Sequence, residues 1–379
     1  MEGLEKLERT DAKDVKDVKS LIEKFSRVMS VTGYEYMAEQ DIRKIIDEDF
    51  CGVFDEIYFD KLGCCRLIKK GVRKIGGTKK ILFDAHLDQI GLVVTEILDG
   101  GFLRVKSLGG IDNNILIASE FYVYTNNSDS ENPFIFSPDD KIPAIAVSIP
   151  PHLKNLKKMK GDDLPKIEDL YLDTGYDSKE ELERIVKIGS PVSFKSDFLI
   201  LENNLVSSVA LDDRLCALTV MFAVKSLKNT PEADVCIVLS VSEESGGLGA
   251  ETAAFDIQPD FAVVLDVGFA QAPEIDASGA FEIGKGVGIS YSAATNMSLT
   301  KKIVALAKDK RIPIQMIAEP GRTGTNADAI QITGEGIPCA LLSVPIKNMH
   351  MQNEICLIQD VEDAAKLVAA IIENAGKLI

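Results

Sequence analysis

The chain has few histidines, few cysteines and fewer basic than acidic side chains. Its 42 Lys and Arg against 59 Asp and Glu give a net charge of −17. This argues against a nucleic-acid binder, which needs clustered cations to displace counterions from phosphates. No run approaches the roughly 18 apolar residues of a membrane span, and the charged first residues are unlike a secretory signal. We therefore expect a cytosolic protein that binds neither nucleic acid nor membrane.

The seven cysteines include no CxxC pair, which excludes a zinc ribbon and argues against a disulfide framework. Cys64 and Cys65 are adjacent in an expected strand, so they should point to opposite faces as small core residues. The only histidines are His86, His152 and His350. Any histidine-dependent metal site must use this short list.

The apolar spacing predicts an α/β domain interrupted by a small β domain. Helical spacing runs over about 12–30, and a buried strand is expected near 81–83. After 205, strands alternate with helices up to a last helix over 361–378, a pattern that implies a mostly parallel sheet with helices on both faces.

Between the two halves of this pattern lie short strands separated by Gly, Pro and Asn clusters. They include a hairpin around Gly100 and Gly101, and one short helix is expected near 178–187. We interpret this part as an inserted small β-barrel domain. The predicted division is 1–92 and 201–379 for the α/β domain, and 93–200 for the insertion.

Side chains of metal-ligand type follow several of the expected strands, where ligands of such sheets bind. They are His86 and Asp88, Asp212 and Asp213, Glu243 and Glu244, Asp266, and His350. Each alone is weak evidence, because an Asp pair before a helix is usually a cap and a Glu pair is usually a solvated turn. Together, carboxylates converging on one edge would repel one another unless cations were present.

Charge balance indicates how many ions such a site would hold. Asp212, Glu244 and Asp266 carry three negative charges, and two neutral histidines add none. Two divalent cations and one hydroxide would neutralise this set. Carboxylate and imidazole ligands suit Zn, Co or Mn.

Several motifs, in order over nearly the whole chain, resemble the glutamyl-aminopeptidase or TET-type dinuclear metallo-aminopeptidases. They include AHLDQIG (85–91), VALDDR (209–214), SEESGGLGA (242–250), TGTNADAI (323–330) and SVPIKNMH (343–350). The resemblance implies release of N-terminal residues from peptides. It also implies a homo-oligomer that pairs through the β insertion and gathers into twelve subunits.

The same resemblance assigns the site residues. It implies that Asp212 bridges two divalent ions, that His86 and Asp266 hold one of them, and that Glu244 and His350 hold the other. Glu243 matches the general base, and Asp88 matches a residue that orients His86. The bond between Asp212 and Asp213 is expected to be a cis peptide.

Other positions that the resemblance touches are not predicted ligands. His152 is expected to be structural, and Gly321–Thr325 is expected beside the substrate pocket rather than to form a phosphate loop, because no GK[ST] follows it. Gln89 and Asn326 depart from the family pattern, and we expect their loops to line the pocket and influence side-chain preference.

Three alternatives remain open. Related carboxypeptidases and deacylases insert their extra domain late, whereas here the longer gap is early: His86 and Asp212 are 126 positions apart, and Asp266 and His350 are 84 apart. An aspartyl-aminopeptidase also inserts early. An inactive assembly subunit of the same fold and a metal-independent two-carboxylate glycosidase are further hypotheses.

Overall fold

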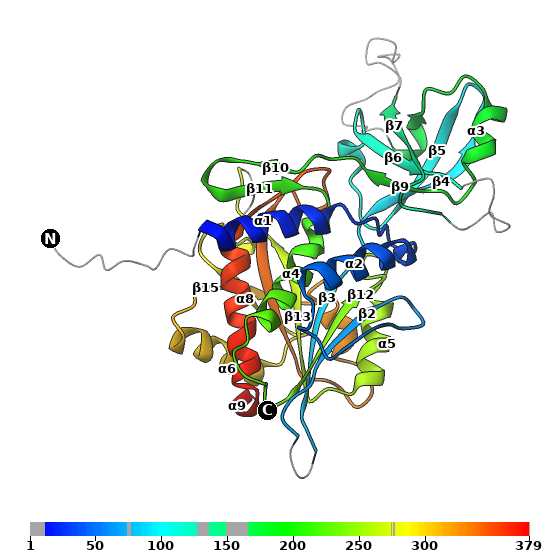
Figure 1. Ribbon diagram of the computed structural model, residues 1–379. Helices are drawn as coiled ribbons and strands as arrows, with labels where there is room; N and C mark the ends of the chain where they lie inside the picture. Colours follow the sequence, from blue (N-terminus) through cyan, green and yellow to red (C-terminus); the bar gives the residue numbers. More distant parts are fainter. Residues whose placement is uncertain are drawn as a thin grey trace.

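The computed structural model describes residues 12–73, 77–126, 136–148, 166–273, 275 and 277–378, and His152 lies outside these ranges. The molecule consists of a large sheet flanked by helices and a small barrel at one end of it (Figure 1). None of the helices in the described ranges combines the length and the apolar character that a membrane crossing requires.

Within the described residues, eleven strands form one mixed sheet. Along the main path the order is β1 (Glu56–Phe59), β2 (Cys65–Lys69), β12 (Asp234–Ser240), β3 (Lys80–His86), β13 (Phe261–Phe269), β16 (Cys339–Lys347), β17 (Glu354–Leu357), β11 (Leu205–Ser208) and β10 (Leu199–Ile200). β14 (Val287–Ser292) pairs with β16 and with β15 (Ile314–Glu319). The four central strands, β12, β3, β13 and β16, are parallel, as expected, and the flanks are antiparallel.

Helices cover both faces of this sheet (Figure 1). Their bounds are α1 (Ala12–Ser26), α2 (Glu39–Asp49), α3 (Lys179–Ile185), α4 (Leu211–Lys225), α5 (Leu248–Ile257), α6 (Met297–Asp309), α7 (Ala327–Ile330), α8 (Ile358–Glu373) and α9 (Ala375–Leu378). α1, α2, α4, α6 and α8 pack on one face, and α5 and α7 pack on the other. α3 belongs to the barrel region.

The central strands read as continuous apolar runs because both of their faces are buried. In β3, Ile81 and Phe83 pack beneath α4, whereas Leu82 joins the core beneath α5. Cys64 and Cys65 likewise lie in the cores on opposite faces, as the sequence predicted. Both thiols are fully buried, which gives them the structural role of small apolar residues.

The inserted part forms a closed antiparallel barrel with its own apolar core. Around the barrel the strands are β4 (Gly91–Ile97), β5 (Phe102–Leu108), β8 (Tyr171–Asp173), β7 (Lys141–Val147), β6 (Glu120–Tyr124) and β9 (Pro191–Phe194). The turn between β4 and β5 uses Gly100 and Gly101, both with φ of 75°. A Cβ on Gly101 would lie 2.0 Å from the carbonyl oxygen of Tyr176, so only glycine fits there.

Candidate active site

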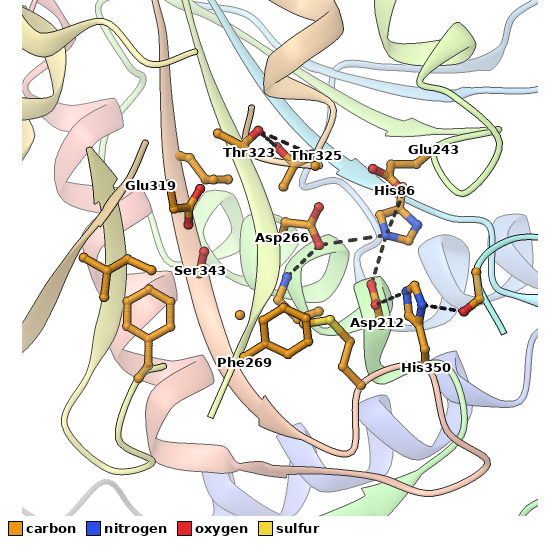
Figure 2. A pocket seen from close by; sticks show the side chains of 18 of the residues that line it. His86, Asp212, Glu243, Asp266, Phe269, Glu319, Thr323, Thr325, Ser343 and His350 are labelled. Atoms are coloured by element: carbon orange, nitrogen blue, oxygen red, sulfur yellow. Dashed lines mark hydrogen bonds and ion pairs between the residues drawn. The ribbon is translucent and has the colours of Figure 1, made fainter. Parts of the chain in front are cut away.

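A cavity of about 480 Å³ lies where the central strands of the sheet end, and six of the seven predicted site residues line it. His86 ends β3, Glu243 and Glu244 follow β12, and His350 follows β16 (Figure 2). The other two are Asp212, at the start of α4, and Asp266, within β13. Asp88, the seventh, is fully buried behind the cavity wall. Chain segments far apart in sequence therefore meet at one edge, as parallel strands require.

Asp212 lies between the two histidines. Its Oδ1 is 3.0 Å from Nε2 of His86, and its Oδ2 is 3.2 Å from Nε2 of His350. Oε1 of Glu244 is 3.3 Å from the same His350 nitrogen. Each oxygen of one carboxylate thus faces a different imidazole, which is the arrangement of a ligand shared between two ions. The peptide bond between Asp212 and Asp213 is cis, as expected.

Both imidazoles are fixed from behind by carbonyl oxygens. Nδ1 of His86 is 2.9 Å from the main-chain oxygen of Asp88, and Nδ1 of His350 is 2.8 Å from that of Gly110. A carbonyl can only accept, so each Nδ1 carries the hydrogen, and a neutral ring presents a bare Nε2 to the cavity. Two such nitrogens and several carboxylate oxygens are a donor set that fits Zn, Co or Mn.

The remaining acids complete this set. Oδ1 of Asp266 is 3.9 Å and Oε2 of Glu243 is 4.0 Å from Nε2 of His86. Two groups of potential ligand atoms lie within 4.8 Å of one another: His86 with Asp212 and Glu244, and His86 with Asp213 and Asp266. Asp213 was not among the predicted ligands. Its Oδ2 accepts from the main-chain N–H of His86, and its buried Oδ1 has no hydrogen-bond partner.

The electrostatics of the cluster favour a cation. Burial raises the pKa of Glu243 to about 7 and that of Asp266 well above its ordinary value. Burial alone would lower the pKa of His350, but hydrogen bonds to Asp212 and Glu244 raise it to about 11. The protein without ions therefore holds extra protons here, which divalent cations would displace.

Three buried carboxylates that do not line the cavity hold the backbone of the site residues. The two oxygens of Asp88 accept from the N–H groups of Glu243 and Glu244, at 3.0 and 3.1 Å. Asp88 therefore contacts His86 mainly through its carbonyl, and its carboxylate, 3.6 Å from the ring, fixes the Glu pair. Glu35 and Glu354 were not predicted, because nothing in their local sequence marks them.

Glu35 and Glu354 each support a residue with a left-handed backbone. Ser242, with φ of 60°, donates its N–H to Glu35 at 2.9 Å. His350, with φ of 61°, donates its N–H to Glu354 at 2.9 Å, and Asp212 donates to the other Glu354 oxygen at 3.0 Å. Such conformations are unfavourable for residues with a Cβ, so these hydrogen bonds stabilise the backbone that presents the site.

The barrel also reaches the site, through the loop that follows β5. Besides the Gly110 carbonyl that fixes His350, this loop places Gly109 against Glu244. A Cβ on Gly109 would lie 2.8 Å from Ile90 and 3.2 Å from Oε2 of Glu244, and the residue has φ of 81°. Glycine is therefore needed where the barrel meets the cluster.

β13 runs further than its sequence pattern indicated. It was expected to end at 265, but it continues to Phe269, so that Val267, Gly268 and Phe269 also line the cavity. Thr323, Gly324 and Thr325, within the segment expected beside the substrate pocket, line it as well.

The expectation that Gln89 and Asn326 lie in the pocket lining was wrong. Gln89 accepts a hydrogen bond from the buried Arg214. Asn326 donates to Asp84 at 2.7 Å and to Ser240 at 2.9 Å. Both side chains are buried in hydrogen-bond networks and absent from the cavity wall, so neither can contact a substrate there.

Comparison with known proteins gives the family. The family model described as M42 glutamyl aminopeptidase matches residues 63–367. A lysyl aminopeptidase of Pyrococcus furiosus is 33% identical over 355 residues, which are 93% of this chain and 96% of the relative.

Solved structures agree. Aminopeptidase APDkam598 from the archaeon Desulfurococcus kamchatkensis is 28% identical with a TM-score of 0.83, and the match covers 95% of each chain. The TET1 peptidase of Pyrococcus horikoshii, described as able to assemble into a tetrahedron or a large octahedral shell, is 29% identical with a TM-score of 0.78, covering 94% of this chain and 99% of that one. The chain therefore belongs to the M42 glutamyl aminopeptidase family and is a peptidase of the aminopeptidase class.

Proposed function

We propose that the chain is a two-metal aminopeptidase that releases residues from the free N-terminus of peptides. The observation that carries this proposal is the position of Asp212 between Nε2 of His86 and Nε2 of His350, both of which are bare in the neutral rings. Family membership supports the aminopeptidase class, and the donor set supports divalent ions, Zn above Co and Mn.

In this proposal Asp212 is shared, His86 and Asp266 serve one ion, and Glu244 and His350 serve the other. Two bound divalent ions would polarise the scissile carbonyl and increase the acidity of a water. Glu243 accepts the proton of the attacking water and later gives it to the leaving amine. Its buried carboxylate, with a raised pKa, is suited to hold that proton.

Asp88, Glu35 and Glu354 are positioning residues in this mechanism. Asp88 fixes the backbone on which both Glu243 and Glu244 stand, so one buried group aligns the base and a ligand together. Glu354 does the same for Asp212 and His350. Such supporting partners commonly affect metal affinity by about 10- to 100-fold.

The test is hydrolysis of aminoacyl-p-nitroanilides before and after chelation. We expect activity to fall to background in strong chelator and to return on addition of Zn, Co or Mn. Activity that survives metal removal would contradict the mechanism and favour a metal-independent hydrolase such as the glycosidase alternative. If the metal-loaded protein hydrolyses none of a broad set of aminoacyl substrates, the inactive assembly subunit becomes the better hypothesis.

We further propose that residues 93–200 form a dimerisation domain beside a catalytic domain of residues 1–92 and 201–379, and that the chain forms a homo-oligomer of up to twelve subunits. The assemblies described for the Pyrococcus horikoshii relative support this. We expect light scattering to give a molar mass several times the 41.3 kDa of one chain. A mass of 41.3 kDa would contradict it. The location in the cytosol stays a prediction from the sequence.

A further inference from the structure

Glu319 is an acid of the cavity that the proposed mechanism does not use. It is the last residue of β15 and lines the cavity together with Ile317, two positions earlier. Because strand side chains alternate between faces, Met316 lies on the other face, where it is half exposed. In Figure 2, Glu319 lies on the opposite side of Asp266 from His86. It therefore belongs to a part of the cavity that is distinct from the metal-ligand cluster.

The Glu319 carboxylate is only half satisfied. Its Oε1 accepts a hydrogen bond from the hydroxyl of Ser290 at 2.9 Å, but its Oε2 is shielded from water and has no hydrogen-bond partner. Burial raises the pKa of this carboxyl, which means that its charged form is poorly solvated. A carboxylate in this situation gains free energy from a cation that enters the cavity.

The protein itself supplies no such cation. Among the described residues that line the cavity there is no Lys and no Arg. The nearby side chains are apolar or hydroxyl-bearing, and they include Phe281, Ile317 and Thr323. Apolar walls that end in a carboxylate match a side chain with an aliphatic stem and a charged tip. The same walls would leave an acidic side chain unpaired beside a like charge.

We propose that Glu319 selects peptides whose N-terminal residue is Lys or Arg. This inference rests on the proposed aminopeptidase function, since it takes the cavity beside the metal-ligand cluster as the site of the N-terminal side chain. The aliphatic stem packs on Phe281 and Ile317, and the cationic tip meets the Glu319 carboxylate. Peptides that begin with Glu or Asp are poor substrates.

The test compares the p-nitroanilides of lysine and norleucine on the metal-loaded enzyme. The two substrates share the four-carbon stem and differ in the ammonium group, so the ratio of their kcat/KM values reports the contact with charge. We expect a ratio of roughly 10 to 100 in favour of lysine, the range of a hydrogen bond to a charged group. Glutamyl-p-nitroanilide should be hydrolysed more slowly than norleucine.

The Glu319→Gln variant keeps the shape and can still accept from Ser290, but it removes the charge. The lysine-to-norleucine ratio should fall to about 1, while norleucine turnover stays near the wild-type value and shows that the variant is folded. Glu335→Gln, an exposed position outside the cavity, makes the same change in net charge and should leave the ratio unaltered.

Each other outcome overturns the inference. A wild-type ratio near or below 1 would remove the cation preference, and an unchanged ratio in Glu319→Gln would assign that preference to another group. An equal loss for both substrates would mean that Glu319 contacts a group common to them, such as the α-amine. Hydrolysis of none of these substrates would instead contradict the proposed function.

Discussion

Replacing Glu243 with Gln is expected to lower kcat by about 10²- to 10⁴-fold, the contribution typical of a general base. The amide cannot accept a proton from the attacking water, yet it occupies the same volume beside His86. The main-chain N–H of residue 243 still donates to Asp88, so the turn should keep its conformation. Metal content, measured by elemental analysis, should therefore equal that of the wild type while turnover of an aminoacyl-p-nitroanilide is almost lost.

Glu251→Gln is a matched control. Glu251 is exposed on α5, seven positions after Glu244, and the substitution changes the net charge by the same amount without touching the cavity. We expect normal kcat and normal metal content in this control. A Glu243→Gln enzyme with nearly normal kcat would show that another group moves the proton.

Replacing Asp212 with Asn should remove the group that faces both histidines. One charge and one of the two acceptor oxygens are lost, while the distances of 3.0 Å to His86 and 3.2 Å to His350 identify the contacts that are affected. Because loss of a supporting partner alone weakens metal binding by about 10- to 100-fold, loss of a shared ligand should weaken it by about 100-fold or more. Bound metal after dialysis and kcat at saturating ion should both fall.

Asp309→Asn is the control for the change in charge, since Asp309 is exposed at the end of α6 and remote from the cavity. The wild-type metal stoichiometry is expected there. If Asp212→Asn keeps its full complement of tightly held ions, the assignment of Asp212 as the shared ligand is contradicted. Far-ultraviolet circular dichroism of the variant separates loss of ligand from loss of fold.

The parts of this molecule that sequence could predict are those that follow from local pattern. Buried runs such as Ile81-Leu82-Phe83 indicated central strands, and the carboxyl ends of those strands indicated where His86 and Glu244 would meet. The hairpin at Gly100 was predicted because two-residue turns have a recognisable composition. In each case a few neighbouring residues carry the information.

The parts that could not be predicted depend on contacts between distant segments. Glu35 and Glu354 come from opposite ends of the chain, and only the folded backbone brings them to Ser242 and His350. The extension of β13 to Phe269 depends on pairing with β16, which the residues after Asp266 do not reveal alone. Gln89 was misplaced because its partner, Arg214, is 125 positions away.

The loop after β5 means that the inserted barrel is part of the catalytic apparatus rather than an accessory to it. Its Gly110 carbonyl fixes which nitrogen of the His350 ring carries the proton. A shift of the barrel relative to the sheet would therefore be transmitted to the ligand ring without any change in the ligands themselves. In this architecture, quaternary strain and metal retention are linked through one peptide group.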